Sequence, residues 1–245
     1  MNADSETGRA AVAGDALGGD TDPGGAAWHA LRQRLLARGL LMARADSLSV
    51  RDPATRRMWW GTEADALARP LPLATGDAPP ALLVRSAAVS AAATAAAIAL
   101  HRAVYAARDD VCAVLVGGGA FGRRLADFGG CMPSVFDEQI RQLGRMAPPT
   151  DDLARLPRAL SGGGNAALHA GQVLLLGMTP DRLALNAELF EKCAKAWVSA
   201  AAGGARVRTL PWLVRHVANG RLMKEQARAR DQVRRGCLPE ETRGY

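Results

Sequence analysis

Aromatic residues are scarce in this 245-residue chain, in which Phe, Trp and Tyr together make up only 4% of the residues. Apolar residues nevertheless reach 49%, so a substantial core must be built mainly from Ala, Leu and Val. Ala-rich sequences favour closely packed helices over the bulky interior of a β-sandwich. The composition therefore predicts a mixed α/β structure that is rich in helices.

Cysteines and long apolar runs are also few. The four cysteines, Cys112, Cys131, Cys193 and Cys237, are widely spaced and form no C-x-x-C motif, which argues against a disulfide framework or a zinc ribbon. The Ala-rich run 87–100 is too short and too weakly hydrophobic to span a bilayer. The N-terminus lacks the basic and apolar regions of a secretory signal. We therefore expect a cytoplasmic, reduced protein with no membrane partner.

Positive charge is unevenly distributed along the chain, which has a formal net charge of +7. Residues 203–245 contain ten Lys/Arg residues against four Asp/Glu, whereas the first 27 residues contain five acids and one base. Such a basic tail could bind nucleic acid or an acidic surface. Aromatic residues are nearly absent after Trp212, so stacking on bases is not supported. The alternative is a solvated helix packed on the edge of the domain.

Residue periodicity divides the chain into alternating helices and strands. Trp28, Leu31 and Leu35 share one helical face, and Thr179-Pro180-Asp181 is a strong helix start because it combines an N-cap hydroxyl with Pro at the first position. The turn Asp52–Thr55 separates two short strands and predicts a hairpin. Helices are expected over 26–38, 86–108, 121–128, 137–145, 179–202 and the basic C-terminal segment. Strands are expected over 47–50, 58–60, 111–116 and 173–176.

Three parts of the chain follow from this pattern. Residues 1–25 carry no periodic apolar signal and are expected to be a disordered tail. Residues 26–204 are expected to form one domain, and 205–245 a basic helical extension. Residues 69–80 are Pro-rich and are expected to be irregular, and 148–152 are expected to be a linker.

Four segments of the domain resemble the class II aldolase/adducin family. Residues 39–53 resemble the family's "GL…GNISVRDP" entry, and residues 100–114 resemble "LHAAIYRARPDVGAVV". Residues 133–144 resemble a "P…DE…LG" segment, and 172–197 resemble "GVVVVGRTLEEALERAELLEEAAKIY". The likeness covers about residues 28–204, in order and without large gaps. It implies a three-layer α/β/α fold with a central, mainly antiparallel sheet flanked by helices, and a ring-shaped homotetramer.

The chain departs from the family where the resemblance implies chemistry. Two of the family's three metal-binding histidines fall at Val116 and Gly118, and the third falls at Gly171. The family's catalytic glutamate falls near Ala97, and its phosphate loop is replaced by residues 43–47. Metal-assisted cleavage beside a carbonyl needs a Lewis acid and a carboxylate that moves a proton. Because Val and Gly side chains offer no lone pair, the three-histidine site cannot form at these positions, and we expect no metal cofactor.

Three functions remain open on this basis. The first is a pseudoenzyme, small-anion-binding or scaffold protein that keeps the domain without its metal-dependent lyase activity. The second is a divergent lyase, epimerase or decarboxylase that acts on a small hydroxy-carbonyl or sugar-phosphate compound. The third is an NAD(P)-binding oxidoreductase, because residues 117–122 fit G-x-G-x-x-G and Asp137 lies twenty residues beyond the first glycine.

The candidate ligand-binding residues are few. Free backbone N–H groups at the turn formed by Gly117, Gly118 and Gly119 could accept an anionic small molecule. His169 lies two residues before a vacated metal position, so a local change of register could bring it near that site. Asp137 matches a family position but also suits the first turn of a helix. His101 is expected to be a packed or surface histidine.

Overall fold

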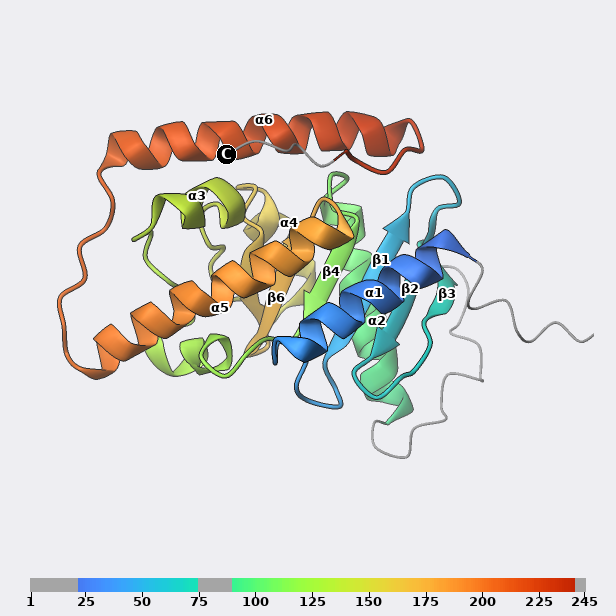
Figure 1. Ribbon diagram of the computed structural model, residues 1–245, viewed down its shortest axis with the longest axis horizontal. Coiled ribbons are helices and arrows are strands. Elements are labelled where there is room, and N and C mark those ends of the chain that lie inside the picture. The colour runs from blue at the N-terminus through green and yellow to red at the C-terminus, as the bar shows by residue number, and fades with distance from the viewer. Residues whose placement is uncertain (1–21, 75–89, 241–245) are drawn as a thin grey trace, which may run out of the picture.

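The computed structural model describes residues 22–74 and 90–240, which form an α/β fold around one six-stranded sheet (Figure 1). The strand order is β3-β2-β1-β4-β6-β5. Every neighbouring pair of these strands is antiparallel. The bounds are β1 (Ser47–Asp52), β2 (Arg57–Thr62), β3 (Arg69–Pro72), β4 (Ala113–Val116), β5 (Ala166–His169) and β6 (Gln172–Gly177). The expected antiparallel sheet is therefore confirmed.

Helices cover both faces of the sheet and make the three layers. In Figure 1, α1 (Pro23–Ala37) and α5 (Pro180–Ala202) cross in front of the strands, with α2 (Ala91–Ala107) behind them. The short helix α4 (Leu156–Leu160) packs against α2. The side chains of β4 alternate accordingly, since Leu115 joins the apolar cluster under α1 and α5 while Val114 and Val116 join the cluster under α2.

A third group of elements lies beside these layers. A 3₁₀ helix, η2 (Gly122–Phe128), follows β4, and α3 (Asp137–Leu143) follows η2. A second 3₁₀ helix, η3 (Leu153–Arg155), leads into α4. The long C-terminal helix α6 (Trp212–Arg234) packs on α3 and runs along the edge of the molecule (Figure 1). The basic C-terminal segment thus contains a helix that packs on α3.

Several expected boundaries need correction. Helix α1 begins at Pro23, where Asp22 accepts a hydrogen bond from the N–H of Gly24, so the tail cannot extend to residue 25. Residues 69–72, expected to be irregular, form the edge strand β3. The strand expected from residue 111 begins at Ala113. Residues 1–21, 75–89 and 241–245, which include the start of the helix expected from 86, lie outside the described residues.

Two unpredicted segments lie next to each other. Residues 166–169 form β5, the outermost strand beside β6. Thr150, in the expected linker, makes an isolated bridge with His169, and its N–H donates to the carbonyl of Leu168 at 3.1 Å. The linker is therefore held against the sheet. Within the described part of the chain, no helix is long and apolar enough to cross a membrane.

Candidate functional site

A pocket of about 410 Å³ opens at one end of the sheet, between α2 and the β5–β6 turn. Strand pairing places Thr62, Ser47 and Val116 side by side, because Ser47 is the register partner of both other residues. All three line the pocket, and α2 provides the facing wall. The alanines of that wall are Ala93, Ala96, Ala97 and Ala99. We call this cavity the alanine pocket.

The sequence explains the open space in the alanine pocket. Helix α2 is almost entirely alanine over its first two turns, with Ser90 as its N-cap accepting from the N–H of Ala93 at 3.2 Å. Ala has the best helix propensity and carries only one methyl group. A helix of this composition is therefore stable although it leaves space beside it. Larger residues, beginning at Ile98, pack the remainder of α2 into the core.

A buried polar network lies directly behind the alanine pocket. His101 is fully buried, with its Nε2 2.9 Å from Ser47 Oγ and its Nδ1 2.7 Å from Ser49 Oγ. Ser49 Oγ also lies 2.8 Å from the hydroxyl of Tyr105. Burial lowers the pKa of His101 to about 3 and raises that of Tyr105. Both side chains are therefore neutral at physiological pH, and His101 is a satisfied core histidine rather than a ligand facing the pocket.

Two polar atoms at the pocket wall are left without a hydrogen-bond partner. The indole Nε1 of Trp60 and the Nδ1 of His169 are both buried and make no hydrogen bond within the described residues. Unsatisfied buried polar atoms are uncommon in folded proteins, because each forfeits its interaction with water. Together with the hydroxyl groups of Thr62 and Thr94, they give an otherwise apolar pocket the means to bind a polar group.

The structure separates the vacated metal and glutamate positions into two groups. Val116 and Ala97 both line the alanine pocket, whereas Gly118 and Gly171 do not. His169 also lines the pocket, on the wall formed by the β5–β6 turn. The β5–β6 turn explains the position, because Ala170 and Gly171 both have positive φ and the turn pairs His169 with Gln172.

The residues of the pocket do not fit a three-histidine metal centre. Val116 and Ala97 present only hydrocarbon where the resemblance places an imidazole and a carboxylate. No cluster of three His, Cys, Asp or Glu side chains suited to a metal occurs in the part of the chain that the structure describes. One imidazole and a few neutral hydroxyl groups are a poor donor set for zinc, which prefers three or four nitrogen, sulfur or carboxylate ligands.

The glycine turn after β4 lies elsewhere and is filled by carboxylates of the chain itself. A Cβ on Gly117 would lie 2.6 Å from Asp46, and a Cβ on Gly119 would lie 2.3 Å from the carboxylate of Glu191. Glu191 accepts the N–H groups of Phe121 at 2.7 Å and Gly122 at 2.9 Å. The N–H groups of Phe121 and Gly122, at the start of η2, are thus occupied by Glu191, and the N–H of Gly117 donates to the carbonyl of Val173.

The structural context of a dinucleotide-binding fingerprint is also missing here. That fingerprint requires a parallel βαβ unit, but β4 pairs antiparallel with both of its neighbours, β1 and β6. The glycines lead into a seven-residue 3₁₀ helix rather than a crossover helix. Asp137 lies exposed in the first turn of α3. It lines neither the glycine turn nor the alanine pocket, so the candidate residues are not brought to one place.

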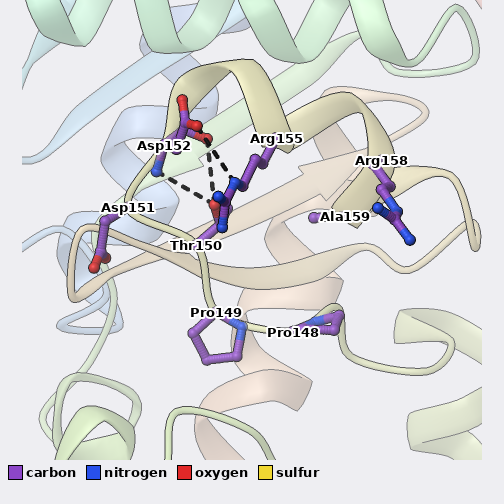
Figure 2. A pocket seen from close by; sticks show the side chains of 8 residues that line it. All are labelled: Pro148, Pro149, Thr150, Asp151, Asp152, Arg155, Arg158 and Ala159. Carbon is purple, nitrogen blue, oxygen red and sulfur yellow. Dashed lines mark hydrogen bonds and ion pairs between the residues drawn. The ribbon is translucent and has the colours of Figure 1, made fainter.

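A wider groove of about 1000 Å³ is formed around Thr150, the residue that bridges to His169. It is lined by residues 148–152 with Arg155, Arg158 and Ala159, and we call it the Thr150 groove. Figure 2 shows Asp152 held between Thr150 and Arg155, with Arg158 standing apart. Leu153, next to this cluster, lines the alanine pocket. This groove was not predicted, because residues 148–152 have the composition of a Pro-rich linker.

Solved structures share this fold at low sequence identity. YgbL from Klebsiella pneumoniae, a proposed aldolase/epimerase/decarboxylase, has a TM-score of 0.58 and 18% identity, covering 78% of this chain and 95% of its own. L-fuculose 1-phosphate aldolase from Glaciozyma antarctica PI12 has a TM-score of 0.61 and 16% identity, covering 85% and 87%. An aldolase II superfamily protein from Pseudomonas syringae has a TM-score of 0.61 and 15% identity, covering 89% and 96%.

No family model matches the chain, and no curated protein matches it. At these identities the structural likeness establishes the fold alone. That fold is the one implied by the four segments that resemble the class II aldolase/adducin family.

Proposed function

We propose that this chain is a class II aldolase/adducin-like pseudoenzyme that uses the alanine pocket to bind a small molecule without metal-dependent lyase chemistry. The observation that carries the proposal is that Val116 and Ala97 line one and the same pocket. The resemblance places a metal-binding histidine at the first position and the catalytic glutamate near the second. The loss of both groups leaves a cavity that is large enough for a small ligand. It lacks the Lewis acid and the carboxylate that metal-assisted cleavage beside a carbonyl needs.

The chemistry of the walls indicates the kind of ligand. Alanine methyl groups, Leu100 and Val116 favour an apolar body. His169 and Trp60 offer a nitrogen each for one or two hydrogen bonds. The described residues that line the pocket include no lysine, arginine or acidic side chain, so the pocket suits a neutral molecule better than a charged one.

Metal analysis of the purified protein tests the loss of the metal site. We expect less than stoichiometric zinc, manganese or iron after dialysis, and no change in metal content on His169→Ala. One tightly held ion per chain that disappears in His169→Ala would contradict the proposal. Gln172→Ala, at the register partner of His169, serves as the control for changes at the same turn.

A divergent lyase or epimerase is the second candidate, and the unpartnered Nδ1 of His169 favours it. An imidazole at a pocket wall could move a proton next to a carbonyl. Deuterium exchange at the carbon atoms of dihydroxyacetone, followed by NMR in D₂O, separates the candidates. The pseudoenzyme proposal expects exchange at the rate of buffer alone, whereas exchange that is abolished in His169→Ala but kept in His29→Ala would establish the enzyme.

We also propose a homo-oligomer in a reducing, cytoplasmic setting. Support for assembly comes from the start of α6, where Trp212, Leu213 and Val217 expose 68%, 63% and 51% of their surface. Exposed apolar patches often mark protein interfaces. The molar mass measured by light scattering should be a multiple of the 25.7 kDa chain mass. Trp212→Ser should lower this molar mass. A monomeric natural protein would contradict the proposal.

All four cysteines are free thiols, as a reducing compartment would keep them.

A further inference from the structure

A second cavity, unrelated to the alanine pocket, lies at the opposite end of β1. Its volume is about 710 Å³, and it lies among the β1–β2 turn, the end of α2 and the end of α6. Among the described residues, five arginines and a single acid, Asp109, line this cavity. These arginines are Arg51, Arg56, Arg102, Arg234 and Arg235. We call this cavity the arginine cleft.

The chain holds these arginines together from distant parts of the sequence. Arg51 and Arg56 flank the β1–β2 turn, and Arg102 lies on α2, where its Nε donates to the carbonyl of Pro72 at 3.1 Å. The C-terminal end of α6 reaches the same turn, since Gly236 lies next to Ala54. Asp109, the only acid among the described residues that line the cleft, is paired with Arg234 at 3.0 Å. The remaining four arginines form no ion pair with the described residues.

Arg51 is the observation that points to a ligand. Its Nε and Nη1 atoms are buried and have no hydrogen-bond partner in the described chain. Its guanidinium group lies 5.8 Å from the centre of the Tyr105 ring, which positions it but accepts no ordinary hydrogen bond. The nearest acid along the strand, Asp52, instead accepts from the N–H of Ala54 and the hydroxyl of Thr55. Two buried donors of a permanent cation are therefore unsatisfied, which is costly unless an acceptor binds.

From this arrangement we propose that the arginine cleft binds a phosphorylated small molecule. Guanidinium groups match phosphate oxygens through forked, charge-assisted hydrogen bonds. A phosphate group carries three oxygens that point in different directions, so it can bind arginines that approach from β1, the turn, α2 and α6. A flat carboxylate can bind only one or two arginines. The cleft is larger than a phosphate group and within the usual range of small-molecule sites, so it has room for the rest of the molecule.

Isothermal titration of the full-length protein with pyrophosphate and with inorganic phosphate tests the proposal. We expect one pyrophosphate per chain, with affinity that falls as salt rises. Arg51→Gln should weaken binding by about ten-fold or more, and Arg235→Gln by a smaller factor, because charge-assisted bonds are lost in each. Arg57→Gln is the matched control, since Arg57 is an exposed arginine of β2 that does not line the cleft.

A folding control and two alternative ligands accompany the titration. Urea denaturation without ligand shows whether Arg51→Gln is folded; if it is not, the exposed Arg235→Gln decides alone. The proposal is overturned if pyrophosphate does not bind, if Arg57→Gln weakens binding as much as the cleft variants, or if malonate binds as tightly as pyrophosphate. It is also overturned if only a single-stranded oligonucleotide binds, which would assign the arginines to nucleic acid instead.

Discussion

At the scale of single residues, His101 makes stability depend on pH. Burial lowers its pKa from 6.5 in the unfolded chain to about 3 in the folded protein. Below pH 6.5 the unfolded chain therefore binds more protons than the folded protein. The stabilising contribution is fully present above pH 6.5 and is lost progressively as the pH falls towards 3. The slope approaches about 1.4 kcal/mol per pH unit in that window.

Urea denaturation at pH 7.5, 6.0 and 5.0 measures this effect. We expect the free energy of unfolding to fall across the series in the natural protein and to fall less steeply in His101→Gln, which has no imidazole to protonate. His216→Gln removes an exposed imidazole on α6 and is the control for the loss of a histidine outside the core. Equal slopes in the natural protein and in His101→Gln would contradict the assignment of His101 as a neutral core histidine.

Two neighbouring acids provide a second prediction at this scale. Asp110 is fully buried and accepts two hydrogen bonds from Arg108, at 2.8 and 2.7 Å, while Arg108 also donates to Gly164 and Asn165. Asp110→Asn should cost about 3–5 kcal/mol, because it leaves a buried guanidinium without its counter-charge. Asp109→Asn removes an exposed pair with Arg234 and should cost less than about 1 kcal/mol. Thermal or urea denaturation of both variants measures the difference, and similar losses would contradict it.

The sequence predicted individual site residues only where they could be aligned with a family pattern. Val116 and Ala97 were found in this way, and both line the alanine pocket. Trp60 was expected in a strand but not as a site residue, and Thr62 lies beyond the strand expected over 58–60; only strand register shows that Thr62 faces Ser47. Glu191 could not be found at all: it reaches the N–H of Phe121 from 70 residues away, and neither residue carries a local signal of that contact.

At the scale of helices and strands, local signals succeeded where capping or alternation was strong. The Thr179 hydroxyl accepts from the N–H of Arg182 at 3.0 Å, as the N-cap prediction requires. Strand β3 was missed because it contains Pro70 and Pro72, which only an edge strand tolerates. Strand β5 was missed because residues 166–169 contain no β-branched or aromatic residue. Pairing with β6 makes it a strand, and this is a tertiary effect.

The β5–β6 turn provides a prediction at the same scale. Ala170 has a φ of 48°, in the left-handed region that a Cβ disfavours. Ala170→Gly removes that penalty and should stabilise the protein by about 1 kcal/mol. Ala167→Gly, in the middle of β5 with extended backbone, is the comparison and should destabilise it. Urea denaturation distinguishes the two signs, and a loss of stability in Ala170→Gly would contradict the turn conformation described here.

At the scale of the whole molecule, α6 joins regions that are far apart in the sequence. It packs on α3 and ends beside the β1–β2 turn, where its last residues help to form the arginine cleft (Figure 1). Gln226 lies in its buried face and donates to the carbonyl of Gly163 at 2.7 Å. The buried positions Leu222, Gln226, Ala229 and Val233 recur at helical spacing. Because Gln226 is polar and Ala229 is small, these positions do not form a recognisable apolar stripe in the sequence. The sequence therefore predicted the helix but not its packing on α3.

This packing predicts unequal effects for two apolar residues of α6. Leu222 is 1% exposed and contacts the region of Gly144, whereas Val217 is 51% exposed one and a half turns earlier. Leu222→Ala should cost about 2–5 kcal/mol through lost burial and a cavity, while Val217→Ala should change stability by less than about 0.5 kcal/mol. Urea denaturation at low protein concentration, where assembly does not contribute, measures both. If Leu222→Ala unfolds at the natural midpoint, α6 does not stabilise the domain, and the arginine cleft that depends on its last turn loses one of its walls.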